Sequence, residues 1–244
     1  MIAQDSAKFW FPKLESHPWQ WMRDWLPKTV LVDYDEELLA PALLGQRSKE
    51  YDRLYYAVGA AIYNIGVPCF IRTDLTSAKH AGKDAYIIND EDDWNHALLT
   101  TLSCAQLKSY HSKVKSSAIM VRQLINVKHE RTAFNGLPIG NEWRVFADQR
   151  GHQCFHHYWP DEALKDKMDD GGPVPLNLWT REWMRTDLQD AAKEAAKAMG
   201  QLKWSVDFVE DVDGKFWLID MATAMNSYHD PRCKFSGLDN MERI

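Results

Sequence analysis

The chain has 244 residues, of which 45% are hydrophobic and 12% aromatic, so it can bury a substantial core and is not a disordered chain. The formal net charge is −6 and there is no long basic run, so tight nonspecific binding to a nucleic-acid backbone is not favoured. No apolar segment approaches the roughly 18 residues that a membrane-spanning helix requires, which excludes such a helix.

Residues 1 to about 30 are rich in Trp, Phe and Pro, and we expect this aromatic segment to pack over a core or cap one. After it, the periodicity and the turn residues predict mixed strands and helices. In chain order these are strand 29–32, helix 48–65, strand 68–72, strand 85–88, helix 92–108, strand 118–125, a hairpin of 142–147 with 153–158, helix 181–199 and a hairpin within 204–221.

This order of elements, with several antiparallel hairpins, predicts an α+β fold of two lobes joined near residues 120–126. The expected division is an aromatic N-terminal segment 1–40, an N-terminal lobe 41–119 and a C-terminal lobe 120–244.

The C-terminal hairpin is the most informative segment. Asp213 and Gly214 predict a two-residue turn, because both tolerate a positive φ. Counting outward from that turn, Val212 pairs with Lys215 and Asp207 lies opposite Asp220. Two opposed carboxylates repel each other, and a divalent cation such as Mg²⁺, which prefers hard oxygen ligands, relieves that repulsion. The alternative interpretation is a surface hairpin with solvated aspartates.

Alternation also predicts the faces of this hairpin. One face is apolar and expected to pack on the core, and it consists of Trp204, Val206, Phe208, Trp217, Ile219 and Met221. The other face is apolar near the turn and polar at the open end, and it consists of Val209, Phe216, Leu218, Ser205, Asp207 and Asp220.

Three basic residues are candidates for binding phosphate. Arg72 leaves a predicted strand, and Lys79 lies in the polar loop that follows, so the two can hold phosphate oxygens from two sides. Arg144 follows Glu142 on one strand face, where a planar cation can stabilise charge on a transferred phosphoryl group. The alternatives are surface charges for Arg72 and Lys79, and an ion pair on the sheet for Arg144.

Two further strands carry polar side chains. The apolar strand of residues 118–127 is interrupted by Arg122 and Gln123, so its peptide groups could pair with an adenine edge, or it is an ordinary edge strand. Alternation places His152, Cys154 and His156 on one strand face, which suggests zinc, although three ligands on one short strand cannot easily surround a metal. A histidine strand lining a pocket is the alternative that we favour.

The cysteines and the N-terminus indicate the compartment. Cys69, Cys104, Cys154 and Cys233 are scattered without a CxxC pair, which is typical of reduced thiols. The N-terminus has no basic region followed by an apolar run, so we expect no secretory signal. Both observations indicate a cytoplasmic protein.

Taken in order, four segments resemble those of the ATP-grasp superfamily: FIRTDLTSAKH, MVRQLI, EWRVFADQRG and VDFVEDVDGKFWLID. The pattern is most similar to a clade of small ATP-grasp proteins of bacteriophages and bacteria, in which an arginine replaces the first nucleotide-binding lysine. It is also similar to the eukaryotic assembly chaperone of translation initiation factor 2. The resemblance implies two α+β lobes with antiparallel sheets that enclose a nucleotide cleft, and ATP and Mg²⁺ as cofactors.

The resemblance also implies roles for individual residues. Arg72 and Lys79 would contact ATP phosphates, and Arg144 would stabilise the transferred phosphoryl group. The adenine would be bordered by Arg122, Gln123 and Leu124.

Magnesium would be held by Asp207 and Asp220. The family's usual Asn two residues after the second acidic residue is replaced by Ala222, so either Asn226 serves instead or the metal has fewer ligands.

The implied activity is that of an ATP-dependent ligase, which phosphorylates a carboxylate and joins the acylphosphate to an amine or similar nucleophile. The substrate would be a small molecule or a peptide, and the location the cytoplasm, which is the host cytoplasm if the protein is phage-encoded. The alternative is an ATP-binding assembly factor that acts on a protein partner without ligase activity.

Overall fold

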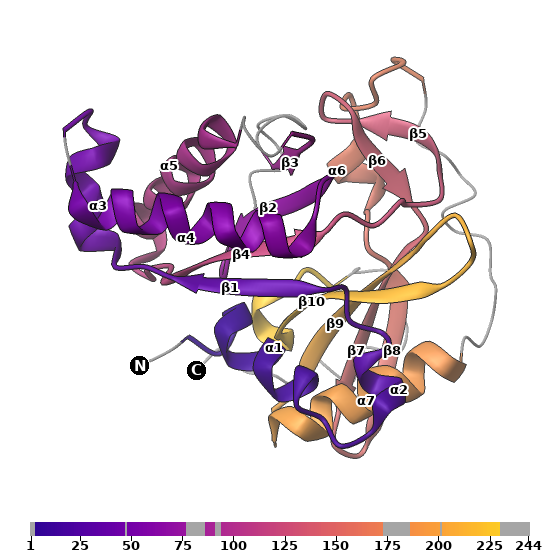
Figure 1. Cartoon of the computed structure of the whole chain (residues 1–244). Coiled ribbons are helices and arrows are strands. Elements are labelled where there is room, and N and C mark those ends of the chain that lie inside the picture. Colours follow the sequence, from indigo (N-terminus) through magenta and orange to yellow (C-terminus); the bar gives the residue numbers. More distant parts are fainter. Residues whose placement is uncertain are drawn as a thin grey trace. The chain divides into compact units, whose positions relative to one another are not determined.

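The computed structural model describes residues 3–46, 48–76, 86–90, 94–172, 186–200 and 202–229. The chain forms two compact units, and each is described here by itself (Figure 1). The first comprises Met1–Lys8, Pro27–Ile125 and Phe134–Leu137, and the second comprises Phe9–Leu26, Asn126–Ala133 and Pro138–Ile244. The main path of the chain leaves the first unit after Ile125.

The first unit is built on a four-stranded antiparallel sheet with the order β1-β4-β2-β3. Its strands are β1 (Thr29–Asp33), β2 (Cys69–Thr73), β3 (Ile87–Ile88) and β4 (Ala118–Gln123). Its helices are α3 (Glu36–Leu43), α4 (Lys49–Ile65) and α5 (Asn95–Ser112). Because β4 pairs with β1 on one side and β2 on the other, the interpretation of this segment as an edge strand is wrong.

Helix α4 forms as its sequence predicts. The Ser48 side chain caps it by accepting a hydrogen bond from the Tyr51 N–H, and Gly66 ends it with φ +87°. Its apolar stripe is buried and includes Leu54 and Val58. This stripe packs with α5 and with alternate residues of the sheet in one core, so α4 and α5 cover one sheet face (Figure 1).

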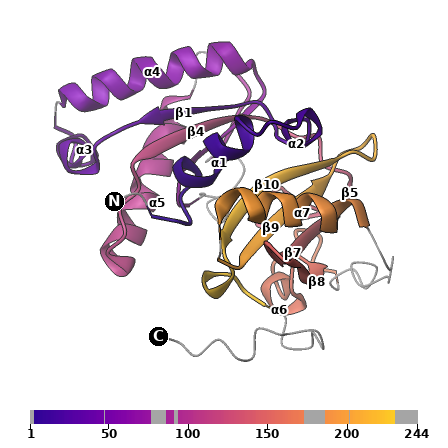
Figure 2. The same cartoon turned by 90° about the horizontal axis from the view of Figure 1, so that it is seen from below.

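The second unit contains a four-stranded antiparallel sheet with the order β10-β9-β7-β8. Its strands are β7 (Glu142–Asp148), β8 (Gly151–His157), β9 (Trp204–Glu210) and β10 (Phe216–Thr223). Helix α7 (Thr186–Met199) packs against β7, β8 and β9 (Figure 2), and its alanines allow a close approach to the strands. Trp25 meets Phe208 edge-on, and the helix before it, α2 (Gln20–Arg23), contacts α7, so the helices cover the Phe208 face.

Smaller elements complete the described chain, and the sequence did not predict them individually. They are α1 (Ala7–Glu15), α6 (Asp161–Leu164), the 3₁₀ turn η4 (Ala224–Asn226), and the two-stranded sheet of β5 (His129–Ala133) and β6 (Leu137–Gly140). Mixed helices and antiparallel sheets confirm the predicted α+β class. None of the helices in the described part of the chain is both long and apolar enough to span a membrane.

The β9–β10 hairpin has a different loop from the one predicted. Asp211 and Lys215 flank a three-residue loop, in which Gly214 alone adopts a positive φ, +81°. The Asp211 carboxylate stabilises this longer loop by accepting hydrogen bonds from the N–H groups of Asp213 and Lys215. The predicted pairing of Val212 with Lys215 is therefore wrong.

A β-bulge between Leu218 and Asp220 adds one residue to β10 and cancels the shift made by the loop. Below the bulge, Leu218 pairs with Phe208, so Trp217 and Leu218 lie on the faces opposite to those predicted. Beyond the bulge, Asp220 lies opposite Asp207, as the sequence predicted.

Candidate functional site

Four ionisable residues lie in one row across the sheet of the second unit. Asp220 is the cross-strand partner of Asp207, Asp207 of Arg144, and Arg144 of His156. Residues directly opposite each other point to the same face of a sheet. The row therefore lies on the face opposite the one that contains Phe208 and packs on the helices.

Arg144 and Asp207 form a bidentate ion pair within this row. The guanidinium Nε lies 2.8 Å from Asp207 Oδ1, and Nη2 lies 2.9 Å from Oδ2. The two side chains are 12% and 6% exposed. Two parallel charge-assisted hydrogen bonds hold the Nε–Nη2 edge of the guanidinium group against the carboxylate.

Arg144 has two other contacts. The Tyr158 ring lies under its guanidinium, 4.6 Å from Cζ to the ring centroid, and Nη1 donates a 3.2 Å hydrogen bond to the Tyr228 carbonyl oxygen. Burial by itself lowers the pKa of Arg144, but the charges of Asp207 and Asp220 and the hydrogen bonds to Asp207 together raise the pKa above its ordinary value. Arg144 is therefore a permanent cation.

The carboxylates of Asp207 and Asp220 fit a divalent cation. Each Asp207 oxygen accepts one hydrogen bond from Arg144 and can accept more, because a carboxylate oxygen has two lone pairs. Asp220 Oδ1 accepts a hydrogen bond from the Met221 N–H. Both groups supply hard oxygen ligands, as Mg²⁺ requires.

Ala222 occupies the position at which the resemblance implies an Asn, and its side chain has no oxygen atom. Ala222 lies opposite Ser205, whose hydroxyl donates to the Ala222 carbonyl over 3.3 Å and lies 2.5 Å from the Ser227 hydroxyl. Asn226, in η4 directly after β10, is exposed and donates from Nδ2 to Thr223 Oγ1 over 3.0 Å. Whether Asn226 is a metal ligand stays a prediction.

The zinc interpretation of β8, the less favoured of the two, finds no support among the side chains that the structure describes. A bulge in the β7–β8 pairing places residue 152 opposite Ala147 and Cys154 opposite Phe146, which breaks the alternation that the prediction requires. The side chain of His152 is outside the described residues. Among the residues that are described, no three or more His, Cys, Asp or Glu side chains are grouped to hold a metal ion.

The first unit contains both of the other predicted arginines, Arg72 on β2 and Arg122 on β4. Arg122 lies opposite Phe70, two residues before Arg72, so both arginines are on one sheet face. The other face contains Ile71 and Val121 and is buried under the helices. Both arginines are largely buried: Arg72 Nε donates to the Thr73 carbonyl, and Arg122 Nε donates to the Thr29 hydroxyl.

The remaining residues predicted to bind the nucleotide are Gln123, Leu124 and Lys79. Gln123 is exposed at the end of β4, and its backbone N–H donates to the Lys28 carbonyl over 2.8 Å, so this N–H already has an acceptor. Leu124 follows the strand and is half-buried. Lys79 lies outside the described residues.

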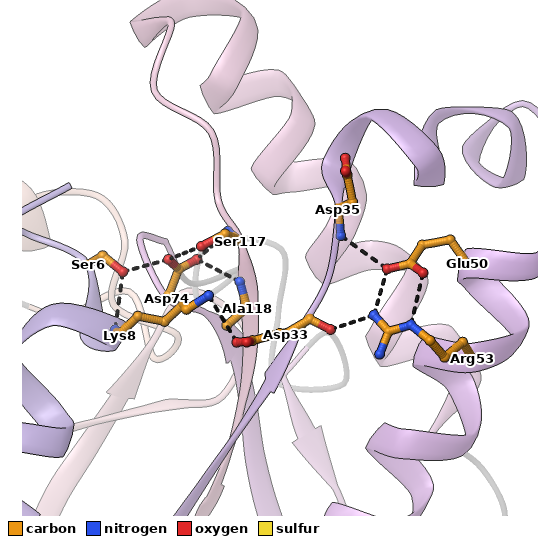
Figure 3. Close-up of polar contacts among 9 residues, drawn as sticks. All are labelled: Ser6, Lys8, Asp33, Asp35, Glu50, Arg53, Asp74, Ser117 and Ala118. Carbon is orange, nitrogen blue, oxygen red and sulfur yellow. Dashed lines mark hydrogen bonds and ion pairs between the residues drawn. The ribbon is translucent and has the colours of Figure 1, made fainter. Parts of the chain in front are cut away.

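Sequence reasoning missed a buried carboxylate directly after β2. Asp74 accepts hydrogen bonds from the Ser6 hydroxyl at 2.6 Å, and from the backbone N–H groups of Ser117 and Ala118 at 3.0 and 3.3 Å (Figure 3). Nearby, Lys8 Nζ lies 3.0 Å from Asp33 (Figure 3). These contacts attach the N-terminal segment to the end of β2, where the predicted phosphate loop begins.

Tyr158 and the Tyr228 carbonyl were also missed as partners of Arg144. Tyr158 lies just after β8, and an aromatic residue next to the partner strand of an arginine is a weak signal for a cation–π contact. The Tyr228 carbonyl has no signal in the sequence, because any residue presents the same group.

Comparison with known proteins gives a structural likeness only. No family model and no curated protein sequence matches the chain. The structure of Cdc123 from Schizosaccharomyces pombe matches with a TM-score of 0.53 at 13% identity, over 90% of this chain and 83% of that one. The ADP complex of PurK, an N5-carboxyaminoimidazole ribonucleotide synthetase, matches with a TM-score of 0.50 at 10% identity, over 93% of this chain and 45% of that one.

The chain has the ATP-grasp fold. This confirms the fold class that the sequence motifs implied. The ATP-grasp ligase PsnB with its minimal precursor matches with a TM-score of 0.45 at 12% identity, over 90% of this chain. The chain spans about half the length of that ligase, since it covers 52% of it.

Proposed function

We propose that this ATP-grasp protein is an ATP-dependent ligase, which activates a carboxylate by phosphorylation and joins it to an amine or similar nucleophile. The observation that carries the proposal is the row of Asp220, Asp207 and Arg144 on one face of a single sheet. Two hard carboxylates beside a permanent, oriented cation are what a phosphate–metal complex requires.

In this proposal Asp207 and Asp220 hold Mg²⁺, which supplies charge neutralisation to the phosphate oxygens when bound. Arg144 binds the phosphoryl group in transfer, because a guanidinium held by Asp207 and Tyr158 needs little reorganisation as charge develops. The described contacts of Arg144 use three of its five N–H groups, so two can donate to phosphate.

The residues of the first unit are assigned to the nucleotide. Arg72 and Lys79 contact the phosphates, and the segment from Arg122 to Leu124 borders the adenine. Arg72 then takes the place of the family's first nucleotide-binding lysine, which supports the small phage and bacterial clade. The burial of Arg72 and Arg122 on the sheet face away from the helices supports this assignment, because arginines are costly to bury without a role.

The reaction follows from these roles. A carboxylate oxygen of the substrate attacks the γ-phosphorus, the bond to the β–γ bridging oxygen breaks, and ADP leaves. The nucleophile nitrogen then attacks the acyl carbon, phosphate leaves, and the nitrogen loses a proton. The substrate is proposed to be a small molecule or a peptide, in the cytoplasm.

A second candidate function is an ATP-binding assembly factor that acts on a protein partner without ligation. Ala222 favours it, because the residue that would complete the metal ligands has no oxygen atom in its side chain. A protein that binds nucleotide but turns it over slowly requires a less complete metal site than a ligase does.

Calorimetric titration of the full chain with ADP and ATP, with and without Mg²⁺, tests nucleotide binding. A Kd in the micromolar range that requires Mg²⁺ supports both functions, and no binding at millimolar nucleotide overturns both. Phosphate release with candidate carboxylates and amines then separates them. Release above that of Arg144→Lys supports the ligase, whereas binding without release, together with a co-purifying protein, supports the assembly factor.

A further inference from the structure

Three consecutive residues after η4, Ser227, Tyr228 and His229, lie on the polar face of the sheet in the second unit. We call them the clasp. Each makes a contact with a different strand, and the middle contact is with Arg144. Ser227 Oγ lies 2.5 Å from Ser205 Oγ on β9, and the Tyr228 carbonyl accepts the hydrogen bond from Arg144 Nη1 on β7.

The third contact of the clasp is with β8. His229 Nε2 lies 3.1 Å from Cys154 Sγ, and the His229 ring stands edge-on to the rings of Phe146 and His156, with centroid distances of 4.9 and 5.4 Å. Cys154 is 4% exposed, so the thiol–imidazole contact is shielded from solvent on the thiol side.

Ser227 closes the 3₁₀ turn η4, because its N–H donates to the Ala224 carbonyl over 3.2 Å. Tyr228 and His229 follow outside any helix or strand, so the contacts of Ser227 and His229 with the sheet help to hold the clasp. With Ser227 fixed on β9 and His229 fixed on β8, the Tyr228 carbonyl is held over β7, between the two anchors. Its oxygen presents a partial negative charge to the one guanidinium nitrogen that Asp207 does not engage.

We propose that Cys154 and His229 are positioning residues for Arg144. Their contact holds the clasp, the clasp holds the Tyr228 carbonyl, and the carbonyl sets the orientation of Nη1. Asp207 fixes one edge of the guanidinium, Tyr158 supports its plane, and Tyr228 fixes the remaining nitrogen. The catalytic consequence depends on the proposed function, in which the remaining N–H groups of Arg144 bind phosphate, whereas the positioning itself does not.

The rival interpretation is that the clasp obstructs the site, because the Tyr228 carbonyl competes with phosphate for Nη1. The two interpretations predict opposite effects of releasing the clasp. Positioning predicts weaker phosphate binding, and obstruction predicts tighter binding.

The test uses the full chain labelled with ¹⁵N-arginine, and observes the Nε–Hε signal of Arg144, assigned from its loss in Arg144→Lys. We expect His229→Ala and Cys154→Ala to shift and broaden this signal, and to weaken binding of Mg²⁺–ADP roughly three- to tenfold. Cys154→Ser retains a hydrogen-bond donor, so its changes in the Arg144 signal and in Mg²⁺–ADP binding should be smaller than those of Cys154→Ala. His96→Ala, at an exposed position of α5, is the matched control and should change neither.

Circular dichroism and the melting temperature show whether each variant is folded, and the comparison is restricted to folded variants. An unchanged Arg144 signal in folded His229→Ala and Cys154→Ala overturns the proposal, and so does tighter ADP binding. If the wild-type chain binds no ADP, the proposed function fails, while the Arg144 signal still decides the positioning.

Discussion

Arg144 and Asp207 are cross-strand partners on β7 and β9, and their side chains meet in two parallel hydrogen bonds of 2.8 and 2.9 Å. Asp220 lies on the other side of Asp207, on β10, and contributes to the electrostatic stabilisation of Arg144. Asp207 thus lies between the arginine and a second carboxylate. The charge balance of the site depends on this arrangement.

Arg144→Ala should destabilise the protein by about 3 kcal/mol, because it leaves the largely buried Asp207 carboxylate unpaired beside Asp220. Millimolar Mg²⁺ should restore more stability to this variant than to the wild type, since the cation can take over the role of the guanidinium. Urea unfolding with and without Mg²⁺ measures both effects. Equal effects of Mg²⁺ on the two proteins would contradict a cation site at the aspartates.

Asp220→Asn should weaken binding of Mg²⁺–ADP by about tenfold, or about 1.4 kcal/mol, because one charged ligand of the cation is lost. The matched control is Asp213→Asn, which removes the same charge from the exposed loop of the same hairpin. Calorimetric titration of both variants makes the comparison. The metal assignment of Asp220 would be wrong if the two Kd values agreed.

Ala222→Asn places an amide oxygen on the side of the strand that carries Asp220. We expect Mn²⁺, used as a spectroscopic substitute for Mg²⁺, to bind several-fold more tightly to this variant, as an added oxygen ligand should raise affinity. Electron paramagnetic resonance of free Mn²⁺ measures the change. Ala60→Asn, on the exposed side of α4, controls for the added amide, and an equal gain there would refute the explanation.

Asp74→Ala should cost about 3 kcal/mol of stability, because it leaves the buried N–H of Ala118 and the half-buried N–H of Ser117 without their acceptor. Asp74→Asn should cost less, since the amide oxygen can still accept from the two backbone N–H groups. Chemical unfolding of both variants gives the ranking. The role of these hydrogen bonds would be disproved by equal losses in the two variants.

His157 should make stability depend on pH. Burial lowers the pKa of His157 to about 4, so the unfolded chain binds a proton more readily than the folded one does. The stabilisation is therefore fully present above the pKa that His157 has in the unfolded chain. As the pH falls from about 7 to about 5, the free energy of unfolding should decrease by about 2 kcal/mol. His157→Phe keeps a ring where His157 stacks on Trp143 at 4.1 Å and should remove this dependence.

The control for that experiment is His96→Phe, which changes an exposed histidine. Urea unfolding at the two pH values measures the slope for each protein. If His157→Phe retained the wild-type slope, another group would be responsible for the acid sensitivity.

Local patterns predicted the elements that depend on local interactions. The apolar stripe and Gly66 predicted α4 almost to the residue, because a helix is set by neighbours within four positions, and the structure adds the cap at Ser48. The opposition of Asp207 and Asp220 was also predicted, although the loop and the bulge each differ by one residue and cancel. The three-residue loop was missed because its stability comes from the Asp211 side chain, which a turn dipeptide does not reveal.

By itself, the sequence determined the three long helices α4, α5 and α7, most of the strands and the two opposed aspartates, because these follow from periodicity and from residues close along the chain. Only the tertiary structure placed β7 beside β9 and the clasp across β7. Arg144, Asp207 and Tyr228 are far apart in sequence, and nothing local encodes which strands become neighbours. Burial of the apolar face against the helices selects that strand order, and the strand order brings the arginine to its carboxylate.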